Sequence, residues 1–499
     1  MSVALVRGAS AHAGRLAVVD DRGEHRYEDL LDAAHRVAGA LLGEAPDLAE
    51  GRVAFLVEPG LDYVAVQWGI WLAGGVAVPL CLSHPAPELD YVLADTGASA
   101  VVASDALAER VRPLAAARGA RVLTTTETRG GAPADALPDV AASRRAMILY
   151  TSGTTSRPKG AVATHSNLLA QVDTLVQAWE WGADDNILHV LPLHHTHGIV
   201  NALLCALRAG ATCEMLPRFD AAAVWRRFGE GGSTLFMAVP TIYSKLIQAW
   251  RELPPDEQAR LSAGCRALRL MVSGSAALPV ATFEEWRRIT GHTLLERYGM
   301  TEIGMALSNP LHGERRAGTV GQPLPGVEVR LCDDAMGPLE PDGRNGGPGE
   351  IEVRGPGVFL EYWDRPDATR DAFRDGWFRT GDVAVVEDGY WRILGRSSVD
   401  IIKTGGYKVS ALEIEEALRA HPDVRDAAVV GVDDPEWGER IAAAVVAEPG
   451  QKPNADALRD YLAARIAPYK LPRVWVAVDD LPRNVMGKVM KPDVKRLFD

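Results

Sequence analysis

The chain has 499 residues, of which 47% are hydrophobic and 24% charged, and its 66 acidic side chains outnumber its 53 basic ones, giving a formal net charge of −13. This length exceeds what one hydrophobic core normally serves, so we expect two or more domains. The acidic balance argues against a nucleic-acid-binding protein that relies on a basic surface, although a local group of donors could still hold an anionic ligand.

Cysteine usage and hydropathy bear on the compartment. The five cysteines are scattered and follow no C-x-x-C spacing, which is typical of a reducing compartment and predicts neither disulfides nor a zinc framework. The apolar part of the N-terminus is too short for a signal peptide, and no run approaches 18 apolar residues. We therefore expect a cytoplasmic protein without a membrane span.

The first part of the chain alternates short apolar runs with helical periodicity. Strands are predicted at 53–57, 76–80 and 100–103, and helices at 61–73 and 89–95. A linker rich in Gly, Ala, Pro and Asp follows at 128–142. The alternation then resumes, with candidate strands at 187–191, 212–216, 235–239 and 268–272. This pattern predicts a mostly parallel sheet covered by helices.

The pattern changes twice in the last third of the chain. Short alternating strands at 328–331, 350–353 and 390–393, separated by turn residues, predict a small antiparallel sheet or barrel. Beyond Gly395, helices at 410–420 and 455–466 alternate with strands at 427–432, 441–447 and 474–478. We therefore predict an α/β fold with a large N-terminal domain, residues 1–396, and a small α+β C-terminal domain, residues 397–499.

The stretch from Thr151 to Gly160 reads T-S-G-T-T-S-R-P-K-G and follows an apolar strand-like run at 146–150. Such a loop offers backbone N–H groups, hydroxyls and a lysine to a polyphosphate. It does not match the Walker pattern. A flexible surface turn is the alternative, but the length of the loop and the strand before it favour phosphate binding.

Five further stretches place polar residues near strand ends, where α/β folds bind ligands. They are 191–198, 273–279, 296–302, 380–382 with Arg396, and 482–488. The histidines of the first could bind a metal, but no Cys or carboxylate is near, and in an extended segment His194 and His195 would point to opposite sides. A polar wall of a substrate site is favoured. Asp382, expected at a turn after a strand, can bind both hydroxyls of a ribose, whereas Lys488 could also be an ordinary surface lysine.

Taken in this order, the six stretches resemble the adenylate-forming superfamily of acyl-CoA synthetases, luciferases and peptide-synthetase adenylation domains, from about residue 10 to the end. Members activate a carboxylate with ATP as an acyl-adenylate and release pyrophosphate. Acyl-CoA synthetases then transfer the acyl group to the thiol of coenzyme A. The resemblance implies that this chain uses ATP, Mg²⁺ and coenzyme A.

The resemblance also implies roles for individual residues. The β,γ-phosphates would be held by Thr151, Ser152, Gly153, Thr154, Thr155 and Lys159. The adenine would lie against Gly274, Ser275, Ala276, Glu296, Arg297, Tyr298 and Gly299. The ribose would be bound by Asp382 and Arg396. Catalysis would involve Thr301 at the α-phosphate, Glu302 with Thr154 at Mg²⁺, His195, and Lys488, which would bridge the α-phosphate and the attacking carboxylate.

In this superfamily the small domain rotates after adenylation. By resemblance, Ser398 is the hinge, and the loop presented to coenzyme A consists of Gly405, Gly406, Tyr407 and Lys408. The rotation would withdraw Lys488 from the adenylation site, so the C-terminal domain is expected to be mobile.

Arg297 is the residue that indicates the acid. Glu-Arg-Tyr-Gly-Met-Thr-Glu, residues 296–302, resembles the malonyl-CoA synthetases, in which the arginine pairs with the distal carboxylate of a dicarboxylic acid. This predicts malonate or methylmalonate as substrate, with His197 and Lys245 as weaker candidates for the same end of the acid. The alternative is that Arg297 is a structural ion-pair partner of Glu296 or Glu302. Three further possibilities remain open. The chain could activate another short or medium carboxylic acid, act as a luciferase-like oxidase, or be an adenylation enzyme that loads a carrier protein in trans.

Overall fold

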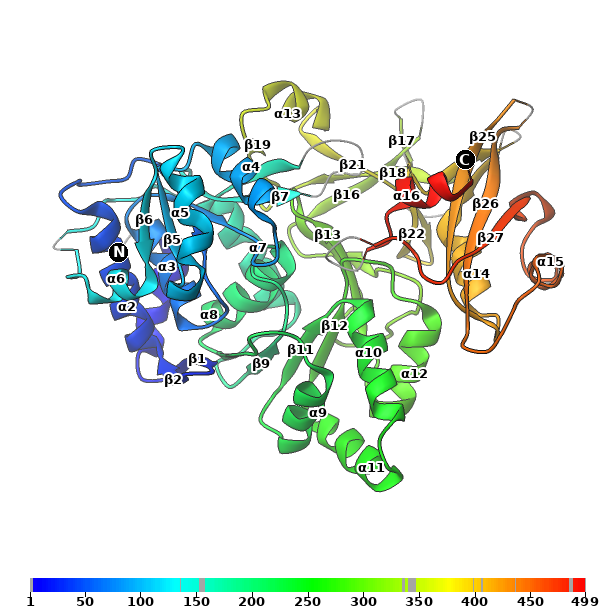
Figure 1. The fold of residues 1–499 in the computed structure, drawn as a ribbon, viewed down its shortest axis with the longest axis horizontal. Coiled ribbons are helices and arrows are strands. Elements are labelled where there is room, and N and C mark those ends of the chain that lie inside the picture. Colours follow the sequence, from blue (N-terminus) through cyan, green and yellow to red (C-terminus); the bar gives the residue numbers. More distant parts are fainter. Residues whose placement is uncertain are drawn as a thin grey trace.

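The computed structural model describes residues 3–134, 136–151, 158–333, 337–339, 347–397, 399–404, 407–435, 437–483 and 488–498, with only the backbone of Lys408. Figure 1 shows two sheets and their helices in one large body, and a smaller orange-red lobe formed by the C-terminal residues. The predicted α/β class, with a large part built on parallel sheets and a small α+β part, is confirmed.

Two large sheets form the main body. The first has nine strands, in the order β15-β14-β13-β12-β11-β9-β10-β1-β2, and the six from β13 to β1 are parallel. Its strands are β1 (Leu16–Asp20), β2 (Gly23–Arg26), β9 (Asn186–His189), β10 (Thr212–Met215), β11 (Leu235–Ala238), β12 (Leu270–Ser273), β13 (Leu295–Met300), β14 (Gly304–Ser308) and β15 (Gln322–Pro323).

The second sheet has seven strands, in the order β19-β8-β7-β4-β3-β5-β6. They are β3 (Arg52–Leu56), β4 (Val76–Pro79), β5 (Ala100–Ala103), β6 (Arg121–Thr124), β7 (Arg145–Thr151), β8 (Lys159–Thr164) and β19 (Glu361–Tyr362). The strands from β7 to β6 are parallel, whereas β8 returns antiparallel to β7 and carries β19 at its outer edge. All four residues of β4 are buried, as expected for a central parallel strand.

Helices cover both sheets. Those of the main body are α1 (Ala4–Arg7), α2 (Tyr27–Leu42), α3 (Leu61–Leu72), α4 (Ala86–Thr96), α5 (Ala108–Ala116), α6 (Thr125–Gly130), α7 (His165–Ala178), α8 (Cys205–Ala209), α9 (Ala221–Glu230), α10 (Pro240–Arg251), α11 (Pro255–Gly264), α12 (Val280–Thr290) and α13 (Pro366–Ala372), with a π-helix, η3, at His197–Leu204. The helix α7 begins directly after β8 because Thr164 and Asn167 form a capping box. No helix within the described ranges is long and apolar enough to cross a membrane.

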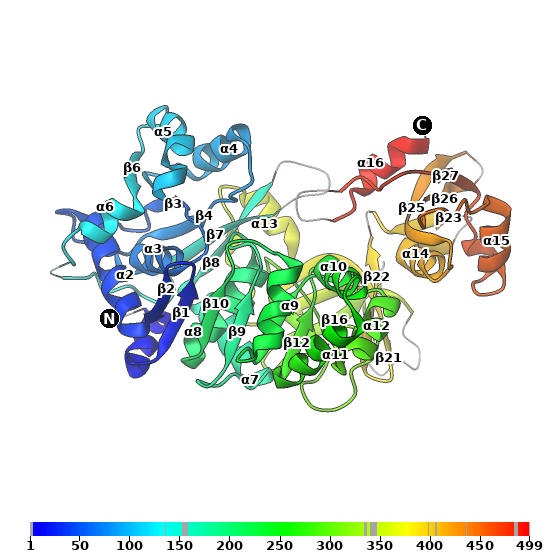
Figure 2. The same ribbon diagram turned by 60° about the horizontal axis from the view of Figure 1, so that its bottom comes forward.

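The last third of the chain forms two smaller sheets. The antiparallel one consists of β16 (Glu328–Cys332), β17 (Pro338–Leu339), β18 (Gly349–Arg354), β20 (Phe373–Arg374), β21 (Trp377–Glu387) and β22 (Tyr390–Arg396). The C-terminal one consists of β23 (Ile401–Thr404), β24 (Tyr407–Ser410), β25 (Val424–Asp434), β26 (Gly438–Ala447) and β27 (Val474–Ala477), packed with α14 (Ala411–Arg419), α15 (Ala455–Ala463) and α16 (Lys491–Lys495). Figure 2 shows this lobe as a separate layer at one end of the molecule.

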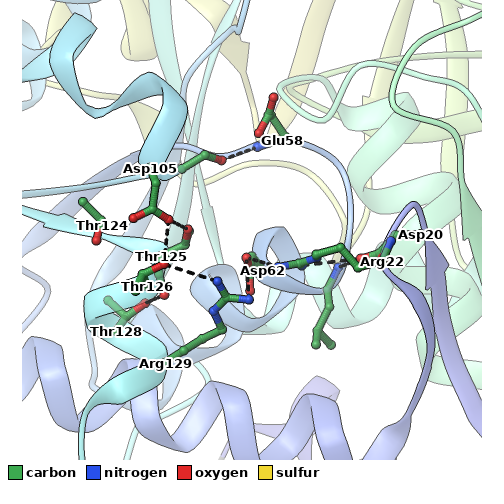
Figure 3. A network of polar contacts seen from close by, with 12 residues as sticks. Asp20, Arg22, Glu58, Asp62, Asp105, Thr124, Thr125, Thr126, Thr128 and Arg129 are labelled. Atoms are coloured by element: carbon green, nitrogen blue, oxygen red, sulfur yellow. Dashed lines mark hydrogen bonds and ion pairs between the residues drawn. The ribbon is translucent and has the colours of Figure 1, made fainter.

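A polar network joins the β1–β2 hairpin to helices α3 and α6 (Figure 3). The residues of this network are distant in sequence from the predicted site residues. Asp62, at the start of α3, pairs with Arg22 at 2.7 Å and with Arg129 of α6 at 3.6 Å. Asp20 accepts the backbone N–H of Leu61 at 2.9 Å, so the hairpin also caps the beginning of α3. These contacts therefore stabilise the main body.

Two predictions of local structure are wrong. The linker predicted at 128–142 begins inside α6, because Thr124 and Glu127 form a capping box that starts a helix before it. Asp382 lies within the long strand β21 rather than at a turn after a strand, because it pairs with Arg396 of β22. The prediction that residues 296–302 lie at a strand end is confirmed, because 296–300 belong to β13 and Thr301 and Glu302 lie in the turn that follows.

Candidate active site

The two ends of the predicted phosphate loop are held together by the β7–β8 hairpin. Thr151 pairs with Lys159, and the Thr151 hydroxyl donates to the Lys159 carbonyl at 3.3 Å. The Tyr91 hydroxyl donates to the carbonyl of Pro158 at 2.7 Å, which fixes the second end. Ser152, Gly153, Thr154 and Thr155 lie outside the described residues. Phosphate binding by this loop therefore stays a prediction, now with a defined hairpin at its base.

The predicted adenine shelf is built from adjacent parallel strands. Ser273 of β12 pairs with Glu296 of β13, so Gly274 follows directly beside Arg297. A Cβ atom at Gly274 would come within 2.5 Å of Arg297 Cζ, which shows that the guanidinium lies against the glycine. Gly299 is needed for a different close approach, because a Cβ there would meet the Gly304 carbonyl of β14 at 2.1 Å.

Arg297 is a buried cation without a described carboxylate partner. Its side chain belongs to a residue that is 3% exposed, and its Nε and Nη2 atoms have no hydrogen-bond partner among the residues that the structure describes. Burial lowers the pKa of Arg297 to about 10, and the nearby Glu296 opposes this shift. An unpaired buried cation is costly, so this site is suited to an anionic ligand.

The structural alternative for Arg297 is not supported by the described contacts. Glu296 instead accepts the backbone N–H of Leu278 at 3.0 Å, and burial raises its pKa to about 8. Glu302 instead accepts a hydrogen bond from the Tyr362 hydroxyl. Neither carboxylate forms an ion pair with Arg297 within the described part of the chain.

His197 lies beside Arg297 at the start of the π-helix η3. Its Nδ1 atom is 3.2 Å from the hydroxyl of Ser275, which follows Gly274 and has a left-handed backbone with φ of +70°. Burial and the charge of Arg297 hold the pKa of His197 well below its usual range, so this imidazole is neutral at pH 7. One turn further along η3, both amide atoms of the fully buried Asn201 lack a described partner. The sequence analysis named His197 but missed Asn201, whose only signal is its place within an apolar helix.

The other two histidines correct an expectation. His194 and His195 do not point to opposite sides; their ring centroids are 3.9 Å apart, because the segment turns here instead of running extended. Burial lowers the pKa of His195 to about 4, so it too is neutral at pH 7. A narrow cavity near this turn is lined by Thr196, Thr301, Val200 and Phe359, which places the turn beside the predicted α-phosphate residue.

The residues of the predicted ribose site lie together and contact one another. Arg396 Nε is 3.0 Å from Asp382 Oδ1, and the Tyr298 hydroxyl donates to Asp382 Oδ2 at 2.6 Å. Tyr298 of β13 and Arg396 of β22 thus both contact the carboxylate of Asp382 in β21. Burial, with Asp382 nearby, raises the pKa of Tyr298 far above its usual range, so its hydroxyl is a donor at all working pH values.

Glu302 contacts a residue that the sequence analysis did not single out. The Tyr362 hydroxyl donates to Glu302 Oε1 at 2.7 Å, and Lys159 Nζ lies 4.9 Å from the centroid of the same ring. Both Glu302 and Tyr362 are buried, and burial raises the pKa of Glu302. Tyr362 was missed because a two-residue strand between Gly/Pro-rich segments gives no periodic signal.

The oxygen donors suit a magnesium ion. Mg²⁺ is usually held by one or two carboxylates together with substrate phosphates and water. Glu302 supplies a buried carboxylate beside the phosphate loop, whereas Thr154 lies outside the described residues. In the part of the chain that the structure describes, no group of three or more His, Cys, Asp or Glu could hold a metal ion by itself.

The C-terminal residues are only partly described. Lys488 is exposed and directly precedes Val489, which forms a bridge with Arg483. Tyr407 is 54% exposed and stacks on Tyr469 with ring centroids 4.3 Å apart. Ser398, Gly405, Gly406 and the side chain of Lys408 lie outside the described part, so the hinge and the CoA-side loop stay predictions.

Lys245 is the candidate that the structure does not bring to the site. It lies on the exposed face of α10, whereas Tyr243, Leu246 and Ile247 form the buried face. No described contact joins Lys245 to Arg297 or His197. It is therefore a weaker candidate than the two buried residues for the distal end of the acid.

Comparison with known proteins identifies the family of the chain. Residues 5–363 match the AMP-binding enzyme family, and residues 413–488 match the AMP-binding enzyme C-terminal domain. The chain belongs to the AMP-binding enzyme family. Relatives within this family include the mitochondrial malonate–CoA ligase ACSF3 of Mus musculus, which is 48% identical over 533 residues covering 100% of this chain and 91% of the relative.

Two solved structures of AMP-binding enzymes extend the comparison. ATP-bound MatB from Rhodopseudomonas palustris is 36% identical, with a TM-score of 0.91 over 100% of this chain and 99% of that one. A malonyl-CoA ligase ternary product complex with methylmalonyl-CoA and AMP is 40% identical, with a TM-score of 0.70 over 95% of this chain and 98% of that one. The overall shape therefore matches the ATP-bound structure better than the product complex, although the sequence identity with the product complex is higher.

Proposed function

We propose that this protein is an AMP-forming malonate–CoA ligase, which activates malonate or methylmalonate with ATP and transfers the acyl group to coenzyme A. The observation that carries the choice of acid is the buried guanidinium of Arg297, which lies beside the neutral His197 and whose Nε and Nη2 have no partner among the described residues. A malonate bound by one carboxylate at the reaction centre would place its second carboxylate against this cation. The names of the relatives, which are malonate–CoA ligases, support the same acid.

The reaction requires charge neutralisation more than a nucleophilic side chain, because one anion, the carboxylate, attacks another, the α-phosphate. Lys159 and the backbone of its loop would hold the leaving pyrophosphate. Asp382, fixed by Tyr298 and Arg396, would bind the ribose, and Thr301 would contact the α-phosphate. When bound at Glu302, Mg²⁺ would neutralise phosphate charge.

Discrimination against monocarboxylic acids follows from the burial of Arg297. A charge-assisted hydrogen bond contributes about 1.5–3 kcal/mol, and an acid without the second carboxylate would leave the cation buried and unpaired. Rejection of such acids by a factor on the order of 10³–10⁵ is therefore expected. A long fatty acid would place its aliphatic chain against the same charge.

We further propose that residues 1–396 and 397–499 act as two domains and that the smaller one carries Lys488 into and out of the site. This chain matches the ATP-bound relative better than it matches the product complex, which supports a second arrangement of the whole chain. For the compartment we keep the cytoplasm as a proposal. The mouse relative is named mitochondrial, and cell fractionation distinguishes the two locations.

The proposed function is tested by pyrophosphate release from ATP with malonate, methylmalonate, acetate and a fatty acid, each with and without coenzyme A. Malonate or methylmalonate should be the fastest acid, and the thioester should form only with coenzyme A. If acetate outran both, the role of Arg297 would be refuted. Transfer to a carrier protein with no transfer to coenzyme A would instead favour an adenylation enzyme acting in trans.

A further inference from the structure

Tyr362 touches both the lysine of the phosphate loop and the carboxylate beside it. Its hydroxyl donates to Glu302 Oε1 at 2.7 Å, and its ring lies 4.9 Å from Lys159 Nζ. The two groups come from segments more than 140 residues apart in sequence.

The backbone around Tyr362 is fixed on both sides. Tyr362 pairs with Ala161 of β8, Leu360 N–H donates to the Val162 carbonyl at 2.8 Å, and Trp363 N–H donates to the Gly160 carbonyl at 2.7 Å. The short strand β19 is therefore joined to the strand that leaves the phosphate loop. A displacement of Lys159 and β8 would be transmitted to the Tyr362 ring.

A second backbone contact joins this segment to Glu302. The Phe359 N–H donates to the Glu302 carbonyl at 2.7 Å, so Glu302 is held at its main chain and at its carboxylate by residues three apart. Tyr362 is 9% exposed and Glu302 is 4% exposed, so water cannot readily replace the hydroxyl.

We propose that Tyr362 is a positioning residue with two separable roles: its hydroxyl orients the Glu302 carboxylate for Mg²⁺, and its ring holds the Lys159 ammonium beside the phosphate loop. This inference rests on the proposed ATP site and not on the identity of the acid. A hydrogen bond to a metal-binding side chain fixes its orientation, and its loss typically lowers metal affinity 10–100-fold. A cation over an aromatic face is stabilised by the ring quadrupole.

Two variants separate the roles. Tyr362→Phe removes the hydroxyl and keeps the ring, whereas Tyr362→Leu removes both. ATP binding is measured by calorimetry at a series of Mg²⁺ concentrations, without any acid. For Tyr362→Phe we expect the Mg²⁺ concentration at half-effect to rise about tenfold, with Mg²⁺-free ATP binding within about twofold of the wild type. For Tyr362→Leu we expect Mg²⁺-free ATP binding also to weaken, by about two- to fivefold.

A matched control is Tyr27→Phe, which removes another buried hydroxyl, one that donates to the Ala211 carbonyl at 2.7 Å away from the site. It should leave the Mg²⁺ dependence unchanged. In a Glu302→Gln background, Tyr362→Phe should add little to the change in Mg²⁺ dependence, since the group that it orients is gone.

An unchanged Mg²⁺ dependence in Tyr362→Phe would overturn the role of the hydroxyl. An equal effect in the Glu302→Gln background would assign Tyr362 a purely structural role. Because the calorimetry needs no acid, a failure of the malonate assignment leaves this test intact. Conversely, if Tyr362 proved to have neither role, the acid preference of the wild type would be unaffected.

Discussion

The Arg297 guanidinium lies against Gly274, so that a Cβ atom on Gly274 would come within 2.5 Å of Arg297 Cζ and 2.6 Å of Nε. Gly274 directly follows β12 and lies beside Arg297 of the parallel strand β13, at the carboxyl edge of the nine-stranded sheet. The absence of a side chain at Gly274 thus helps to set the position of the Arg297 guanidinium, which is proposed to bind the substrate.

Gly274→Ala should displace Arg297 without unfolding the protein, because the crowded atoms are the far end of a flexible side chain. A displacement of about 1 Å can lower a rate on the order of 10²-fold, so kcat/KM for malonate should fall by about one to two orders of magnitude. Steady-state kinetics measure it. Gly182→Ala is the control, since no atom lies within 4 Å of its added Cβ. Equal malonate kinetics in both variants would contradict the packing argument.

Lys488→Ala should abolish adenylation while it spares thioester formation from supplied malonyl-AMP. The reason is that the lysine is expected to bridge the carboxylate and the α-phosphate only in the first half-reaction. Pyrophosphate release measures the first step and malonyl-CoA formation the second. Equal loss of both steps would refute the two-conformation proposal.

Glu296 should make stability depend on pH. Burial raises its pKa to about 8, with the Glu416 carboxylate adding to the shift, from an ordinary value of 4.5. The folded protein therefore binds a proton that the unfolded chain releases above about pH 4.5. This contribution to stability is fully present below that pH and is lost as the pH rises toward 8, by up to about 1.4 kcal/mol per pH unit.

Thermal unfolding of the wild type and of Glu296→Gln from pH 5 to 8 measures this contribution. The midpoint of the wild type should fall relative to that of the variant as the pH rises. Parallel curves would show that Glu296 is ionised in the folded protein throughout this range.

Asp62→Asn should lower stability without a change in kinetics. The Asp62 side chain is 12% exposed and pairs with Arg22 and Arg129 in the network of Figure 3. We expect a loss of about 1 kcal/mol, smaller at high salt. Asp32→Asn breaks the exposed pair with Arg36 and should cost less. A changed KM for malonate in Asp62→Asn would show that the network reaches the active site.

The sequence alone predicts the strands well where burial on both faces makes a continuous apolar run. Residues 100–103 and 235–239 are examples, with observed strands at Ala100–Ala103 and Leu235–Ala238. It also predicts that Asp382 and Arg396 belong together, which their pairing across β21 and β22 explains. It does so only through family resemblance, because spacing alone says nothing of a cross-strand partner.

What the sequence does not predict depends on tertiary contacts. The close approach of the His194 and His195 rings requires a turn that local composition does not signal, and the contacts of Tyr362 join segments far apart in the chain. That Arg297 has no carboxylate partner in the described part of the chain is also a tertiary property, since Glu296 is adjacent in sequence yet accepts a hydrogen bond from Leu278.

The most direct measurement of the central claim is the ratio of kcat/KM for malonate to that for propionate, in the wild type and in Arg297→Leu. Propionate has the same number of carbon atoms as malonate but lacks the second carboxylate. The account predicts that the wild type prefers malonate by a factor on the order of 10³ or more. It predicts that Arg297→Leu loses most of this preference while ATP still binds. A wild type that favours propionate, or a preference that survives the loss of Arg297, would contradict it.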